Sequence, residues 1–169
     1  ASPLQATPSS DLDYQAVGAR IPEADIASTS NNGNGIRFGL AVYSNLMEAT
    51  YPALSSDGGA TWRIAGPLFY VAAADGPSVT GSVGALGSEG AYFWGQGGNF
   101  VKVTTDEGAQ WWLTGFAAGV YKVSASHGVL RTVALGNQVS CSDFEAFLYV
   151  STDTGRTWRF HGRLANVKI

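Results

Sequence analysis

The chain has 169 residues, of which 45% are apolar and 14% are charged, and this composition predicts one well-buried globular domain rather than a disordered segment. Ten Lys and Arg against 13 Asp and Glu give a net charge of -3, so no basic stripe is available for phosphates and nucleic acid is not an expected partner. No apolar run approaches the roughly 20 residues that span a bilayer, so no transmembrane segment is predicted, and the lone Cys141 excludes an intrachain disulfide framework.

The chain opens on small and polar residues, Ala-Ser-Pro-Leu-Gln-Ala-Thr-Pro-Ser-Ser, with no initiator Met. Such an opening is typical of a chain from which a signal peptide has been removed, so the expected location is secreted or periplasmic. Residues 1–15 are predicted to form a flexible N-terminal segment, and residues 16–169 the folded domain. The stretch before Ala16 and the tail after Trp158 can each pair with a neighbouring sheet as a clasp.

Short apolar, β-branched and aromatic runs separated by Gly, Asn and Ser predict strands throughout the domain, and helical periodicity is missing from almost all of it. The strands fall into three blade-like units of four, at about 16–66, 67–115 and 116–162. Their predicted ranges are 16–21, 36–43, 49–54 and 62–65; then 68–74, 91–95, 100–104 and 110–114; then 120–126, 129–135, 146–151 and 157–161. The glycine-rich stretch 81–90 precedes no helix, so it is not predicted to cradle a phosphate.

The strongest pattern in the chain is a turn sequence that occurs three times, with its aspartates at intervals of 49 and 47 residues. The interval is long enough for one four-stranded unit. The pattern is Ser/Thr-x-Asp-x-Gly-x-Thr/Gln-Trp. Its members are Ser55, Asp57, Gly59, Thr61 and Trp62; Thr104, Asp106, Gly108, Gln110 and Trp111; and Ser151, Asp153, Gly155, Thr157 and Trp158.

These residue types suit a hairpin turn. An Asp at the head of a turn can accept backbone N–H groups from the residues ahead of it, and the Gly two positions later can adopt a positive φ. The Trp begins the outgoing strand and is large enough to anchor the turn on the sheet. We therefore expect these residues to be structural rather than catalytic or metal-binding.

The three turns resemble the Asp-box, or bacterial neuraminidase repeat, of sialidases, sortilin-type receptors, some xyloglucan-cleaving glycosidases and propeller assembly factors of photosystems. The resemblance implies an all-β, β-propeller-like fold of three four-stranded Asp-box blades. In that family the box joins the third and fourth strands of a blade at its periphery, away from the face that binds ligands. The second box departs from the pattern with Thr104 and Gln110, which implies weaker internal hydrogen bonding.

Arg20-Ile21-Pro22 resembles the segment that supplies a carboxylate-binding arginine in sialidases. Such an enzyme also needs two later arginines and a tyrosine nucleophile with its glutamate, from blades that a chain of this length does not contain. We therefore favour Arg20 as a surface strand residue and expect no catalytic residue. No cofactor or metal is expected either, because acidic pairs such as Asp143 with Glu145 lack the repeated oxygen-ligand spacing of a calcium loop.

A propeller typically needs about four to eight blades, so three leave two sheet faces uncovered. The expected partner is therefore a second copy, with a homodimer favoured, or a larger protein assembly on which the chain docks. Three functions follow. The first is an exported, non-enzymatic interaction module that binds a protein or a glycan. The second is a sialidase-like glycoside hydrolase assembled across an oligomer, and the third is a structural subunit of a larger complex.

Overall fold

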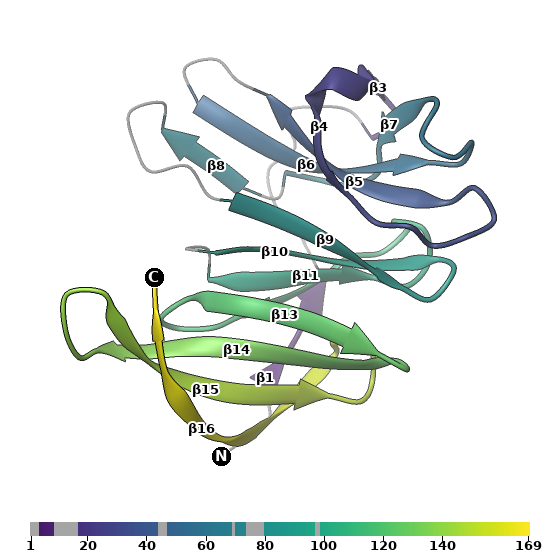
Figure 1. Cartoon of the computed structure of the whole chain (residues 1–169). Helices are drawn as coiled ribbons and strands as arrows, with labels where there is room; N and C mark the ends of the chain where they lie inside the picture. The colour runs from purple at the N-terminus through teal and green to yellow at the C-terminus, as the bar shows by residue number, and fades with distance from the viewer. Residues whose placement is uncertain (1–3, 9–16, 44–46, 69, 74–79, 97–98) are drawn as a thin grey trace.

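The computed structural model describes residues 4–8, 17–43, 47–68, 70–73, 80–96 and 99–169 (Figure 1). The fold is all-β, as predicted, and consists of three antiparallel sheets with no α-helix among the described residues. No described helix is long and apolar enough to cross a membrane.

Each sheet contains four strands that follow one another in the chain as an antiparallel meander. Sheet I comprises β4 (Ile26–Thr29), β5 (Arg37–Tyr43), β6 (Met47–Ser55) and β7 (Trp62–Ile64). Sheet II comprises β9 (Thr80–Leu86), β10 (Gly90–Gln96), β11 (Phe100–Thr104) and β12 (Trp112–Gly115). Sheet III comprises β13 (Val120–Ser126), β14 (Val129–Gln138), β15 (Asp143–Ser151) and β16 (Thr157–Lys168).

The N-terminal part of the chain adds one strand to the outer edge of each sheet. The strands β1 (Leu4–Gln5), β2 (Thr7–Pro8) and β3 (Arg20–Ile21) pair with β16, β12 and β7 respectively. We call these three strands the N-terminal strap. Residues 4–8 of the segment expected to be flexible are therefore paired, as a clasp within the chain, whereas residues 9–16 lie outside the described residues.

The first strands of the first two units differ from the prediction. Of the predicted strand at 16–21, the described part forms the edge strand Arg20–Ile21, while the meander begins at Ile26 after a 3₁₀ turn, η1 (Glu23–Asp25). The predicted strand at 68–74 corresponds to β8 (Tyr70–Ala73), which pairs with β6 in sheet I and not with sheet II. Sheet II instead begins with the glycine-rich strand β9.

The three sheets stack in chain order, with sheet II between the other two (Figure 1). One buried cluster joins sheets I and II and contains Phe38, Leu40, Leu54, Ala65, Ala91, Phe93 and Trp111. A second joins sheets II and III and contains Leu86, Val101, Val103, Phe116, Val120, Val123, Leu130, Ala134 and Trp158. The hydrophobic core therefore consists mainly of the two interfaces between sheets.

The far face of sheet I is covered by this chain itself. Its buried residues Tyr51, Trp62 and Ile64 are 1%, 3% and 0% exposed, and they share a cluster with Ile21, which is packed against Ile26. The apolar residues that were expected to be buried by another chain on this flank are therefore already buried within this chain, and the segment that includes η1 joins β3 at one edge of the sheet to β4 at the other. The far face of sheet III has no further sheet packed on it among the described residues.

Candidate functional site

The three turns that carry the repeated Asp motif, which we call the Asp-box turns for their resemblance to that motif, join the third and fourth strands of each sheet. Their hydrogen bonds follow one scheme. In the first turn, Asp57 Oδ1 accepts the Thr61 N–H at 2.9 Å, and Asp57 Oδ2 accepts the Thr61 hydroxyl at 2.6 Å. The Ser55 Oγ accepts the Gly59 N–H at 2.8 Å and donates to Asp57 at 2.7 Å. The carboxylate is therefore engaged within its own turn.

The third turn repeats this scheme. Asp153 accepts both the N–H and the hydroxyl of Thr157, at 2.9 and 2.5 Å, and Gly155 donates its N–H to Ser151 at 2.8 Å. In the second turn, Thr104 takes the place of Ser, and Asp106 accepts the Gln110 N–H at 2.9 Å. Because Gln110 has no hydroxyl, the second turn lacks the bond that Thr makes to the carboxylate elsewhere.

The hydrogen bonds keep two of these carboxylates ionised. The hydroxyl and the N–H of Thr61, together with the Ser55 hydroxyl, lower the pKa of Asp57 from 3.8 to about 2. Partial burial opposes ionisation of Asp153, but the bonds from Thr157 and Ser151 outweigh it and lower the pKa of this group as well. No group of three or more His, Cys, Asp or Glu that could hold a metal occurs in the described part of the chain.

The tryptophans of the turns are buried, as predicted, with 3%, 5% and 0% of Trp62, Trp111 and Trp158 exposed. Two of them tie one sheet to the preceding sheet. Trp111 donates its indole N–H to Ala65 O at 3.2 Å, and Trp158 donates to Thr114 Oγ1 at 3.2 Å. Trp62, with no sheet before it, donates to Gly59 O of its own turn at 3.0 Å. The second and third turns therefore connect successive sheets.

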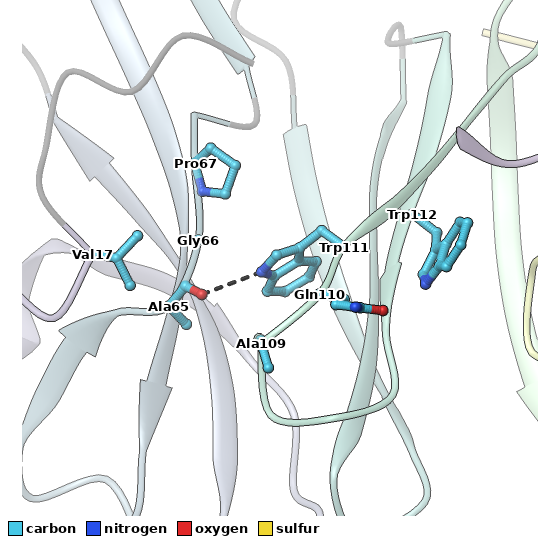
Figure 2. A pocket seen from close by; sticks show the side chains of 9 residues that line it. Val17, Ala65, Gly66, Pro67, Ala109, Gln110, Trp111 and Trp112 are labelled. Atoms are coloured by element: carbon cyan, nitrogen blue, oxygen red, sulfur yellow. Dashed lines mark hydrogen bonds between the residues drawn. The ribbon is translucent and has the colours of Figure 1, made fainter. Parts of the chain in front are cut away.

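A hollow of about 510 Å³ lies between the end of sheet I and the second turn (Figure 2). Its lining includes Ala65, Pro67 and Trp111. Val17, which is 61% exposed, lines it too, and Trp112 of the same lining pairs with Pro8. None of the described residues that line this hollow carries a charge, and we place the candidate ligand site elsewhere.

The candidate ligand site is a pocket of about 460 Å³ between sheet III and the segment that joins β12 to β13. We call it the aromatic pocket. It lies at the start of β15, which is the end of sheet III opposite its Asp-box turn. Its lining residues are Gly115, Phe116, Ala117, Ala118, Ala134, Leu135, Gly136, Asn137, Glu145, Phe147 and Tyr149.

Aromatic rings form one side of this pocket. Phe116 meets Tyr149 edge to face with ring centroids 5.5 Å apart, and Tyr149 meets Phe160 at 5.7 Å. Phe147 packs on Phe160 at 5.9 Å, and Phe160 itself is 40% exposed. The rings hold one another in place, and Phe147 and Tyr149 are half-buried, so part of their surface is available to a ligand.

A fixed carboxylate lies beside the rings. Glu145 Oε1 accepts the Asn137 N–H at 3.0 Å, and Glu145 Oε2 lies 3.2 Å from the Arg163 guanidinium. Gly136 is required here, because a Cβ at that position would lie 2.4 Å from the Phe147 ring and 3.2 Å from Glu145 Oε1. An apolar wall with a few oriented polar groups can stack on a sugar ring and bind its hydroxyls.

The structure does not bring Arg20 to this pocket. Arg20 is exposed on the edge strand β3, pairs with Arg63, and shares a hollow of about 160 Å³ with Arg63, Thr61 and Trp62. This position is beside the first Asp-box turn. Arg20 therefore lies as predicted, on a strand at the surface.

Sequence reasoning did not find the aromatic pocket. Its signal in the sequence is the alternation of Glu145, Phe147 and Tyr149, which places the three side chains on one face of a strand. Their juxtaposition with Phe116, which precedes β13, depends on the stacking of sheets II and III. Scans of known family models, curated proteins and solved structures found no match to this chain.

Proposed function

We propose that this protein is a non-enzymatic binding module that takes a glycan in the aromatic pocket. The observation that carries the proposal is the combination of Phe147 and Tyr149 with the fixed Glu145 carboxylate. Stacking of a sugar ring on these aromatic faces buries apolar C–H surface, while the carboxylate and the Asn137 side chain offer hydrogen-bonding groups to hydroxyls.

The proposal includes the scaffold. We infer that the three sheets are blades of a partial β-propeller of the Asp-box type. Three features support this inference: each sheet is a four-stranded meander, an Asp-box turn joins its third and fourth strands, and successive sheets pack face to face. The aromatic pocket lies away from the Asp-box turn of its sheet. Proteins of the Asp-box family also bind their ligands away from these turns.

A binding role is favoured over hydrolysis by the contacts of the pocket's carboxylate. The Glu145 side chain is 17% exposed, and its two oxygens are engaged by the Arg163 guanidinium and the Asn137 N–H. A glycosidase of the usual kind needs one protonated and one ionised carboxyl group on opposite sides of the scissile bond. Asp143, the other acidic residue of β15, is held ionised, since hydrogen bonds from Ser140 and Lys168 lower its pKa.

Saturation-transfer NMR with a panel of neutral and sialylated oligosaccharides tests the proposal. We expect Phe147→Ala to abolish the transfer signals of every glycan that the wild type binds. Phe144→Ala is the matched control, because Phe144 lies on the same strand but faces the other side of sheet III, and it should leave binding unchanged. The absence of any glycan signal with the wild type would contradict the proposal, and release of sugar from a fluorogenic sialoside would favour a glycosidase instead.

A further inference from the structure

The far face of sheet III can be compared with the faces of sheets I and II that pack against the next sheet. On sheet I, Leu54 points toward sheet II and is 1% exposed. On sheet II, Val101 and Val103 point toward sheet III and are 1% exposed each. Val150 precedes the aspartate of its turn by three residues, as Leu54 and Val103 do, and Leu148 precedes it by five, as Val101 does. Both residues of sheet III are only half-buried.

Cationic side chains surround these two residues. Arg131 pairs with Val150, Val150 with Arg159, and Lys122 with Val133. Directly paired residues share a face of a sheet. This face is the one opposite Leu130 and Ala134, which pack on sheet II. We call it the outer face of sheet III, defined by Lys122, Arg131, Val133, Leu148, Val150 and Arg159.

The outer face carries three cations and no acidic residue on its strands. Asp143 and Glu145, the two acidic residues of β15, lie on the other face with Phe147. Lys122, Arg131 and Arg159 are all exposed, and none of them forms a salt bridge that the structure shows. The result is a half-buried apolar strip bordered by positive charge.

The opposite end of the molecule carries an acidic segment. The 3₁₀ turn η1 contains two carboxylates and no basic residue, whereas residues 116–169 contain six Lys and Arg against three Asp and Glu. The segment that joins β3 to β4 presents Glu23 and Asp25 in η1, at the opposite end of the stack from sheet III (Figure 1). One chain cannot bring these two ends together, because sheet II separates them.

We propose that the outer face of sheet III binds the η1 end of a second copy of this chain, head to tail. The apolar strip formed by Leu148 and Val150 packs against that end, while Arg131 and Arg159 face Glu23 and Asp25 of the second copy. Two copies related by a two-fold axis form this contact twice, which gives a closed dimer of six sheets and leaves neither end free. The proposal does not depend on a ligand in the aromatic pocket.

Light scattering coupled to size exclusion, from low to high micromolar concentration, tests the proposal on the intact chain. We expect the wild type to shift from monomer to dimer as its concentration rises. The protein concentration at the midpoint of this shift should rise with added salt, since salt screens the attraction between charges. Arg159→Glu places like charges across the contact and should weaken dimerisation about tenfold or more. Lys168→Glu is the matched control, because it makes the same charge change on the other face of β16 and should leave the midpoint unchanged.

A charge exchange separates a specific contact from a general loss of folding. Combining Glu23→Arg and Asp25→Arg with Arg131→Glu and Arg159→Glu restores opposite charges across the contact, so dimerisation should return to within a few-fold of the wild type. Circular dichroism melts check that each variant is folded. A wild type that stays monomeric throughout, a dimer insensitive to Arg159→Glu, or an unrescued quadruple variant that is folded would each overturn the proposal. Growth beyond a dimer with concentration would show an open head-to-tail chain and overturn the closed arrangement.

Discussion

Among single residues, the aspartate of each Asp-box turn supplies the hydrogen-bond acceptor for the backbone N–H four positions later in the turn. Asp153 accepts the N–H and the hydroxyl of Thr157. Asp153→Ala should therefore reduce the free energy of unfolding by about 1 to 3 kcal/mol, because these donors lose their acceptor. Urea denaturation measures the change. Glycan binding should be unaffected, and a variant that melts like the wild type yet binds ligand more weakly would assign Asp153 to a site instead.

The lowered pKa of Asp57 predicts a specific response to acid. A group whose pKa is about 2 in the folded protein and about 3.8 otherwise stabilises the fold at pH values above its unfolded pKa. That stabilisation is lost as the pH falls from about 4 toward about 2. Thermal melts between neutral pH and about pH 2 should show this loss in the wild type, and Asp57→Asn should have a lower melting temperature at neutral pH but a smaller further loss in acid. Equal losses in both proteins would contradict the assignment.

Trp158 and Trp112 differ in how deeply their side chains are buried. Trp158 is 0% exposed, packs edge to face on Phe116 with centroids 5.7 Å apart, and bonds to Thr114 of sheet II. Trp158→Ala should cost about 3 to 5 kcal/mol of stability, the usual range for a large core aromatic. Trp112 is half-buried with the Arg156 guanidinium 4.5 Å from its ring, so Trp112→Ala should cost clearly less in the same denaturation experiment. Equal losses would show that Trp158 does not join the sheets.

At the scale of elements, the N-terminal strap links the three sheets at their outer edges through short pairings. Ala6, between β1 and β2, donates its N–H to Arg156 O at 2.8 Å. Ala6→Pro removes this donor. We expect a loss of about 1 kcal/mol, together with faster hydrogen exchange of amides in β1 and at the start of β16. Ala6→Ser keeps the N–H and should exchange like the wild type, and unchanged exchange in the proline variant would mean that the strap does not protect this edge.

The strands that sequence reasoning placed correctly are rich in alternating or β-branched residues, and they include β11 and β15 next to an Asp-box turn as well as β13 away from one. The strand β9 was missed because Gly81 and Gly84 suggested a break, whereas each glycine makes room for a neighbouring side chain. A Cβ at Gly81 would lie 2.0 Å from Leu40 of sheet I, and one at Gly84 would lie 2.0 Å from Tyr92. These reasons are tertiary contacts, which no local pattern reveals.

Tertiary contacts also explain the other differences. The strand β8 was assigned to the second unit by its position in the chain, but it pairs with Met47–Thr50 of β6. The strand β16 continues to Lys168, past the predicted end at His161, because register shifts let it follow the long β15. The aromatic pocket could not be predicted for the same reason, since Phe116 reaches Tyr149 only when sheets II and III stack.

At the scale of the whole molecule, stability depends on the two interfaces between sheets, and each is closed by a glycine of an Asp-box turn. A Cβ at Gly108 would lie 2.6 Å from Ala65 O of sheet I. At Gly155 it would lie 2.9 Å from Val103 of sheet II and 3.1 Å from Leu130. Gly108 and Gly155 thus have two roles: each adopts the positive φ that closes its hairpin, and each leaves room for the preceding sheet to pack closely. Sheets II and III should therefore unfold together, as one cooperative unit.

Gly155→Ala tests this cooperation. Its φ of +85° makes any side chain unfavourable by roughly 1 to 2 kcal/mol, and the contact with Val103 adds a steric term that must separate the sheets. Gly128→Ala is the matched control, since Gly128 has a φ of +77° but open space around its Cβ position. Both variants should lose unfolding free energy because of the backbone strain. Gly155→Ala should lose more, and its denaturation should be broader and less cooperative, because sheet III no longer packs closely on sheet II. If the two variants were equally stable with transitions of equal sharpness, the interface between sheets II and III would not be what holds the molecule together.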